Sequence, residues 1–442
     1  MLMLLLSAII YSLSFISPKY FGWLIIFWWL PCVIFFKKYS FGSGFIWGLI
    51  VWGSHFIWLL FLLINKSYAH WSLAFLLYFL IIIFFSFTSG FLFWGYSGIV
   101  KLFKDNFLTR AFVLLLSWLL YINIILNFGS VITGKLEGYP FANPLIPLVN
   151  YKFIAKIILF FSHIYIVSPG GSSTPEYLKS SLDKISFISP ASWGAGGLVT
   201  EAQGPIGCGQ SVFHELSRLL SHNTVGESAP IVVDSPTVSK ESGALVKSSD
   251  KLKIICAPES TFPFSLNKYP EILLLWSGIL PKKTHFFLGA QMTVDKKIYQ
   301  VVYWINQGRI INCYVKKHRV PFVEYMPKFW RIITPFTNIF LKEHDAFAKP
   351  REGIGVKSFR FSHDFSFYPQ VCSELFYINS GDTRGTSQKE KAKVILFFVN
   401  DSWFINFFKD WLERLAYLRA LVTQCPIIYC AHSKGRVISP VG

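Results

Sequence analysis

A series of long apolar runs, separated by short polar breaks, occupies the N-terminal part of the chain. The runs cover residues 2–16, 21–36, 41–63, 72–96, 107–126 and 153–167. A helix needs about 20 apolar residues to cross the hydrocarbon core of a bilayer. The third, fourth and fifth runs satisfy that length, and the first, second and sixth are shorter. We therefore predict a multi-span α-helical membrane domain over residues 1–168, in which the first run is a span or half-span.

The composition agrees with a membrane protein. Hydrophobic residues make up 53% of the chain and charged residues only 15%, against about 25% charged residues in soluble domains. The formal net charge of +18 fits basic cytoplasmic loops and attraction to anionic lipid headgroups. No Lys- and Arg-rich run with interleaved aromatic residues lies outside the apolar context, so we expect no nucleic-acid partner.

Basic residues in the short loops indicate the orientation of the predicted helices. Positive charges follow the second and fourth runs, at Lys37, Lys38, Lys101, Lys104 and Arg110. Because cytoplasmic loops carry an excess of Lys and Arg, both loops should face the cytoplasm. The sixth run is too short for the roughly 30 Å hydrocarbon core, and Lys156 lies near its entrance. We predict that this run does not cross, so that an odd number of crossings precedes the rest of the chain.

The character of the chain changes after the apolar runs. Gly, Ser and Thr make residues 169–180 a flexible linker. Beyond it, short β-type runs alternate with helical stretches, which predicts an α/β layered domain over residues 181–442. We expect strands at 184–189, 252–256, 284–289, 299–304, 371–376 and 393–399, and helices at 212–220 and 405–422.

Two segments of this second domain carry acidic or amino side chains that could take part in catalysis. Segment 256–264 (CAPESTFPF) places Glu259 behind an apolar strand, where the functional groups of α/β proteins commonly gather. By itself such a glutamate is more often a solvated cap. Segment 314–327 (YVKKHRVPFVEYMP) carries two lysines and Glu324, and on spacing alone it would be a charged surface loop.

A cysteine adds a nucleophile to this set. Segment 370–377 (QVCSELFY) places Cys372 at a strand end, with Glu374 two residues further on; a buried structural cysteine is the default for such a position. A thiol must lose its proton to attack a carbonyl, a nearby carboxylate can take that proton, and an ammonium can stabilise the resulting oxyanion. The seven cysteines are an odd number without a Cys-x-x-Cys pair, so we expect neither a disulfide framework nor a zinc site.

At these segments the chain resembles the apolipoprotein N-acyltransferase family, whose catalytic domain belongs to the nitrilase, or carbon–nitrogen hydrolase, superfamily. CAPESTFPF resembles the segment of the general base, YVKKHRVPFVEYMP the lysine segment, and QVCSELFY the nucleophile segment. NDSWF at 400–404 and residues 432–442 resemble later parts of that domain, and GYPFANPLIPL at 138–148 resembles the membrane domain. The resemblance implies a nitrilase-like α-β-β-α sandwich over residues 181–442.

The resemblance also implies roles for individual residues. Glu259 would be the general base, Lys316 the oxyanion-stabilising lysine and Cys372 the nucleophile. Lys317 is the rival for the lysine role, but the family motif has one residue between Lys and His, which selects Lys316. Supporting roles are implied for Glu324, which positions the lysine, and for Ser373, Glu374 and Trp403.

The implied reaction is acyl transfer in two steps. Cys372 takes a fatty acyl chain from a phospholipid as a thioester, which then passes the chain to the N-terminal amine of a diacylglyceryl-modified apolipoprotein. No metal or organic cofactor is implied. The resemblance places the chain in the inner (cytoplasmic) membrane of a bacterium, multi-pass, with the catalytic domain on the periplasmic side.

The chain departs from the family pattern in three ways. Ser373 stands where a Tyr is expected and Val323 where a Gly is expected, so the loop near the site should be shaped differently. Further strands and a closing span are expected beyond Gly442, so we expect a chain truncated at its C-terminus. Two alternatives stay open: a membrane-tethered amidase or nitrilase with the same three residues, and an inactive homologue that only binds lipid or lipoprotein.

Overall fold

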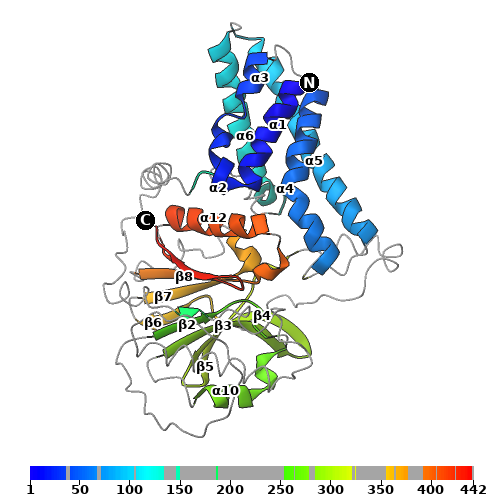
Figure 1. Cartoon of the computed structure of the whole chain (residues 1–442). Coiled ribbons are helices and arrows are strands. Elements are labelled where there is room, and N and C mark those ends of the chain that lie inside the picture. The colour runs from blue at the N-terminus through cyan, green and yellow to red at the C-terminus, as the bar shows by residue number, and fades with distance from the viewer. Residues whose placement is uncertain are drawn as a thin grey trace, which may run out of the picture.

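Apolar helices stand above a domain of two β-sheets (Figure 1). The computed structural model describes residues 1–35, 40–66, 71–103, 106–133, 146–149, 186–187, 253–262, 264–277, 284–320, 324, 355–362, 365–376, 392–404, 406–423 and 425–440. The predicted order, helices first and an α/β domain second, is confirmed. The linker at 169–180, the predicted helix at 212–220, the sixth apolar run and Val323 lie outside the described residues.

Within the described residues, two helices are long and apolar enough to cross a membrane, as judged by length and composition. They lie in α4 (Phe41–Lys66) and α5 (Trp71–Val100), and match the third and fourth apolar runs. The fifth run forms α6 (Phe107–Thr133), of which Phe107–Ile122 is a shorter apolar helix.

The first two runs form a bent pair rather than two straight helices. Helix α1 (Leu2–Ile16) is followed by α2 (Pro18–Phe21), η1 (Gly22–Ile26) and α3 (Leu30–Phe35), and the chain bends by 116° between Leu2–Ile16 and Pro18–Ile34. Ser17 precedes Pro18, and a residue before proline is driven out of the helical region. Ser17 accordingly has φ −133° and ψ 66°. This pair would contribute a third span if it is counted as one.

The second domain contains two five-stranded sheets. The first has the order β1 (Ser186–Phe187), β2 (Lys253–Ala257), β3 (Thr284–Val294), β4 (Lys297–Asn306) and β5 (Arg309–Val315). The second has the order β10 (Gly435–Ile438), β9 (Ile427–Ala431), β8 (Ala392–Val399), β7 (Phe365–Val371) and β6 (Phe359–Ser362). In the first sheet β1, β2 and β3 are parallel to one another, and in the second sheet β7, β8 and β9 are parallel to one another. The remaining neighbouring strands are antiparallel.

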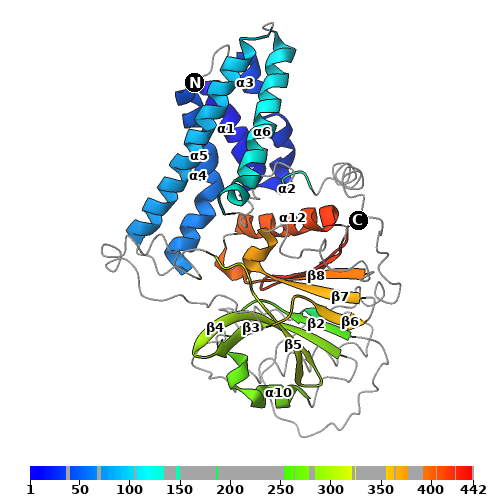
Figure 2. The same cartoon turned by 180° about the vertical axis from the view of Figure 1, so that it is seen from behind.

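The alternating side chains of the strands separate two cores. In β2, Ile254 and Cys256 join the core between the sheets, whereas Ile255 and Ala257 join a second cluster with Ile272. That second cluster lies under η6 (Leu266–Lys268) and α10 (Pro270–Ser277). Helix α12 (Asn406–Thr423) covers the outer face of the second sheet (Figures 1 and 2). The predicted α-β-β-α sandwich is therefore confirmed.

The strand predictions are correct in place for β1, β2, β3, β4 and β8, and the helix predicted at 405–422 is α12. The prediction at 371–376 is wrong. Strand β7 ends at Val371, and Cys372–Phe376 form the 3-10 helix η8. The reason is the backbone of Cys372, whose φ of +49° takes the chain out of the extended conformation.

Candidate active site

The predicted site residues lie where strands of both sheets end. Glu259 lies two residues beyond β2, Lys316 directly follows β5, and Cys372 directly follows β7. Asn400 and His432 follow β8 and β9 in the same way. Parallel strands bring their carboxyl ends to one edge of a sheet, and the sandwich brings the two edges together.

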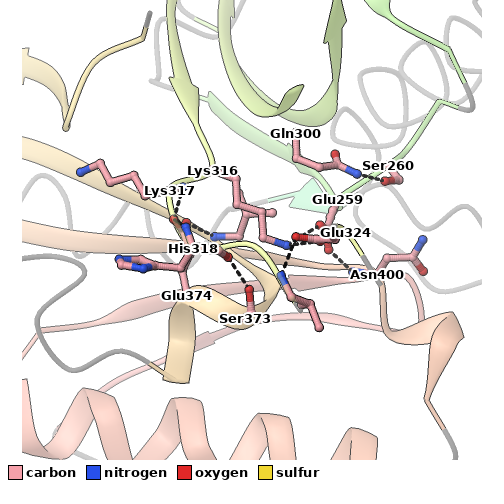
Figure 3. A network of polar contacts seen from close by, with 12 residues as sticks. Glu259, Ser260, Gln300, Lys316, Lys317, His318, Glu324, Ser373, Glu374 and Asn400 are labelled. Atoms are coloured by element: carbon pink, nitrogen blue, oxygen red, sulfur yellow. Dashed lines mark hydrogen bonds and ion pairs between the residues drawn. The ribbon is translucent and has the colours of Figure 1, made fainter. Parts of the chain in front are cut away.

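Lys316 lies between two carboxylates (Figure 3). Its Nζ donates to Glu259 Oε1 at 3.3 Å and to Glu324 Oε1 at 2.6 Å. All three residues are buried, at 2%, 2% and 1% exposure for Lys316, Glu259 and Glu324. Burial alone would lower the pKa of Lys316, but the two carboxylates outweigh it and hold the pKa above its ordinary value. The ammonium therefore stays protonated.

Lys317, the rival lysine, points elsewhere. Its Nζ lies 5.6 Å from the ring centroid of Tyr314, and in Figure 3 its side chain extends away from Glu259 and Glu324. Burial lowers the pKa of Lys317 below its ordinary value. Consecutive residues of an extended segment point to opposite sides. One lysine of the pair can therefore enter the site while its neighbour leaves it.

Glu259 is held through both its side chain and its backbone. Its Oε2 accepts a hydrogen bond from the backbone N–H of Asn400 at 3.1 Å, and its carbonyl oxygen lies 2.6 Å from His432 Nε2. Strand β3 runs very close behind it at Gly289, where an added Cβ would lie 2.7 Å from Glu259 Cα. These contacts leave the carboxylate little freedom to move away from Lys316.

Cys372 occupies a strained and buried position beside this ion pair. Its φ is +49°, and it is 4% exposed. Burial and then the charge of Glu259 raise the pKa of the thiol well above its ordinary value, while Lys316 acts in the opposite direction. The thiol is therefore protonated at neutral pH, and the carboxylate of Glu259, whose charge acts on this thiol, is the group that would take the proton.

Glu324 completes the ion cluster. Its Oε2 accepts from the backbone N–H of Val320 at 2.9 Å, while its Oε1 accepts from Lys316. Burial and then the charge of Glu259 raise its pKa, and Lys316 opposes them. The carboxylate is thus fixed from the backbone and in turn fixes the lysine.

Glu374 links the end of β5, which precedes Lys316, to η8, which begins at Cys372. Its carboxylate accepts from the hydroxyl of Tyr314 at 2.9 Å and from the backbone N–H groups of Lys317 and Val371 at 2.6 and 2.9 Å. Ser373 adds a second link, because its hydroxyl donates to the carbonyl of His318 at 2.6 Å. Both residues hold the loop after β5 against η8.

Trp403 is the last residue of η9 (Asp401–Trp403), and its side chain lies outside the described part of the structure. The sequence motifs predict no role for Asn400, His432 or Gly289, which contact Glu259. The position of Asn400 directly after an apolar strand was the signal available for it. Across the described ranges, no group of three or more His, Cys, Asp or Glu side chains is arranged to hold a metal ion.

Comparison with known proteins gives the site a context. The chain is 29% identical to an apolipoprotein N-acyltransferase of Allorhizobium ampelinum, over 42% of this chain and 37% of that protein. It is 30% identical to the apolipoprotein N-acyltransferase of Haemophilus influenzae, over 40% of this chain and 35% of the relative. It is 29% identical to that of Aquifex aeolicus, over 45% of this chain and 43% of the relative. The chain resembles apolipoprotein N-acyltransferases.

Each match to these apolipoprotein N-acyltransferases spans less than half the length of the curated relative. No protein-family model matches the chain. Among solved structures, a CN-hydrolase superfamily protein of Xanthomonas campestris is 13% identical, with a TM-score of 0.27 over 42% of this chain and 70% of that one. A nitrilase-superfamily protein of Saccharomyces cerevisiae is 14% identical, with a TM-score of 0.28 over 43% and 70%. With its long apolar helices, the chain is a membrane protein.

Proposed function

We propose that this chain is an N-acyltransferase that moves a fatty acyl chain from a phospholipid, through a thioester on Cys372, to the N-terminal amine of a diacylglyceryl-modified apolipoprotein. The observation that carries the proposal is the buried pair of Glu259 and Lys316, 3.3 Å apart, whose charges act on the buried thiol of Cys372. The apolar helices above the site and the similarity to apolipoprotein N-acyltransferases support the lipid substrates.

In the first half of the reaction Glu259 takes the proton of Cys372, and the sulfur attacks the carbonyl carbon of the phospholipid ester. The carbonyl oxygen of the ester becomes an oxyanion, which the ammonium of Lys316 stabilises. The oxyanion collapses, the C–O bond to the glycerol breaks, and the leaving lysophospholipid takes the proton back from Glu259. The product is an acyl thioester on Cys372.

In the second half the N-terminal amine of the apolipoprotein attacks the thioester carbonyl. Glu259 accepts a proton from the attacking nitrogen, and Lys316 again stabilises the oxyanion. When the C–S bond breaks, an amide forms and the sulfur regains its proton. Lys316 keeps its own proton throughout, because the two carboxylates raise its pKa.

The place of the protein in the cell belongs to the same proposal. We place it in the bacterial inner membrane, with the catalytic domain on the periplasmic side, and take residues 1–168, 169–180 and 181–442 as membrane domain, linker and catalytic domain. Lipid substrates that stay in the bilayer give a catalytic domain a reason to be joined to membrane helices.

The test is a two-substrate assay on the detergent-solubilised full chain. The donor is a phospholipid with an alkyne-tagged acyl chain, and the acceptor is a synthetic diacylglyceryl-cysteine peptide. We expect the tag on the peptide amine, and we expect no tag with Cys372→Ala. Hydrolysis of a small amide without transfer to the peptide would instead favour a membrane-tethered amidase. No adduct and no turnover would favour an inactive homologue.

A further inference from the structure

A tryptophan of the membrane helices contacts the segment that holds Glu259. Trp58 of α4 stacks on Phe408 of α12 with ring centroids 4.1 Å apart and an interplanar angle of 20°. It also contacts Phe404, which directly follows η9, with ring centroids 6.2 Å apart. The ring centroids of Phe404 and Phe408 are 4.7 Å apart, so the three rings form one cluster at the junction of the two domains.

From this ring cluster a short covalent and hydrogen-bonded path leads to Glu259. The backbone N–H of Phe404 donates to the carbonyl of Asp401 at 3.2 Å, which closes η9. The residue before η9 is Asn400, whose backbone N–H donates to Glu259 Oε2 at 3.1 Å. The position of the Asn400 N–H, which donates to the proposed general base Glu259, therefore depends on how η9 packs.

The other side of η9 is fixed within the catalytic domain. The carboxylate of Asp401 accepts from the backbone N–H of Ser433 at 3.0 Å and from its hydroxyl. The neighbouring His432 contacts the carbonyl of Glu259. Glu259 is thus held from two segments, and one of them is seated against a membrane helix.

Helix α12 makes further contacts with the N-terminal region on the same side as Phe408, and hydrogen bonds from Trp411 and Arg414 are among them. The indole N–H of Trp411 donates to the carbonyl of Phe15, in the last turn of α1, where carbonyls have no partner within the helix. Arg414 donates to the carbonyl of Pro147 at 3.3 Å. Positions 408, 411 and 414 are three residues apart, so they lie along one face of α12.

We infer that Trp58 is a positioning residue, which fixes the donor at Asn400 on Glu259 by seating η9 and the start of α12 against α4. This inference rests on the proposed function, because it concerns the group that takes the proton of Cys372. It makes removal of that proton depend on the docking of the membrane helices, through the ring contacts of Trp58 with Phe404 and Phe408.

The test compares Trp58→Leu and Trp58→Phe with Trp47→Leu in the full chain. Trp47 is a matched control, because it is buried at 1% exposure and packs on Tyr11, Trp28 and Phe93 within the helices. The readout is the rate at which iodoacetamide alkylates Cys372, measured by mass spectrometry of its peptide. In that reaction the sulfur displaces iodide and Glu259 takes the thiol proton, so no lipid is required.

We expect Trp58→Leu to slow alkylation of Cys372 about tenfold or more, because Glu259 then leaves the orientation in which it takes the thiol proton, and a catalytic group displaced by about 1 Å can lose on the order of 100-fold in rate. Trp58→Phe, which keeps a ring on Phe408, should restore most of the rate. Trp47→Leu should lower the thermal unfolding midpoint at least as much and leave the alkylation rate within about twofold. Equal slowing in both leucine variants, or no rescue by Phe, overturns the inference.

The acyl-transfer assay separates this inference from the proposed function. If the wild type transfers no acyl chain but the alkylation rates differ as expected, the substrate proposal fails and the positioning role stands. If the wild type transfers acyl chains and Trp58→Leu alkylates as fast as the wild type, the positioning role fails alone.

Discussion

The ammonium of Lys316 lies within hydrogen-bonding distance of two carboxylates in a place that water does not reach. Removing such groups from water costs several kcal/mol each, and apolar side chains of similar volume would often be at least as stable there. Buried ionisable clusters of this kind recur at active sites. A catalytic role accounts for the cluster of Glu259, Lys316 and Glu324 better than stability does.

The two adjacent lysines give the first prediction. Lys316→Met should lower the rate of thioester formation at Cys372 by about 100-fold or more, because the oxyanion loses the ammonium whose protonated form the two carboxylates maintain. Lys317→Met should lower the rate much less, because that side chain lies over Tyr314. Both rates are measured by burst-phase labelling with a tagged phospholipid. Equal losses in the two variants would mean that the lysine has been assigned to the wrong position.

The thiol gives a prediction about pH. Burial, followed by the charge of Glu259, raises the pKa of Cys372 well above its ordinary value. The thiolate fraction should therefore keep rising with pH beyond about 8.5, where an ordinary thiol begins to level off. Alkylation of the Cys372 peptide by iodoacetamide is followed between about pH 6 and pH 10, with glutathione as the reference thiol. A maximal rate already reached at pH 8.5 would contradict a raised pKa.

At the scale of elements, the sequence predicted those strands whose apolar pattern is simple. Strand β2 is a short apolar run before Pro258 and was expected. Strand β5 was not, because it is an edge strand in which three of the seven residues are exposed, and its pattern is therefore similar to that of a loop. Strand β7 contains Pro369 although it lies between β6 and β8, and a proline argues against an inner strand.

The sequence predicted which segments form the site, but not how their residues are arranged in space. The motifs around Glu259, Lys316 and Cys372 selected the residues, and the structure brings these residues together. No local pattern reveals that Cys372 adopts a positive φ, or that a backbone N–H after β8 reaches Glu259 across 141 residues of sequence. Such contacts depend on how the two sheets pack, which is a property of the whole domain.

The hairpin of β9 and β10 gives a prediction about stability. Glu413 of α12 pairs with Lys434 and Arg436 of the hairpin. Burial alone would raise the pKa of Glu413, but the two cations hold it below its ordinary value. The folded chain then binds fewer protons than the unfolded chain between the two pKa values. This contribution to stability is complete above about pH 4.3 and is lost as the pH falls through the lower, folded value.

Glu413→Gln should therefore lower the thermal unfolding midpoint at pH 7 and change it less at pH 3. The midpoints of the wild type and the variant are measured in the same detergent at both values. A difference that stays constant or grows on acidification would show that the pairing does not contribute in this way.

At the scale of the whole molecule, α12 lies between the second sheet and the membrane helices (Figures 1 and 2). Buried side chains form one continuous cluster from α1 and α4 through α12 into the core between the sheets. The orientation of the helices in the membrane therefore also sets where the site lies relative to the bilayer.

We predict an odd number of crossings before the linker, which would place the catalytic domain outside the cytoplasm. The basic loops after the second and fourth apolar runs should be cytoplasmic. Alkaline phosphatase fused after Thr174 should be active. If a fluorescent protein fused there is bright while the phosphatase is silent, the sixth run crosses and the domain is cytoplasmic.

The central claim is that Cys372 carries the acyl chain between the two substrates. The most direct measurement is mass spectrometry of the Cys372 peptide after the full chain has been incubated with a phospholipid of defined acyl chain and no acceptor. The account predicts a mass increase of that acyl group on Cys372, which hydroxylamine or the diacylglyceryl-cysteine peptide removes, and which Glu259→Gln slows by about 100-fold or more. An unmodified Cys372 in a preparation that still acylates the peptide would contradict it.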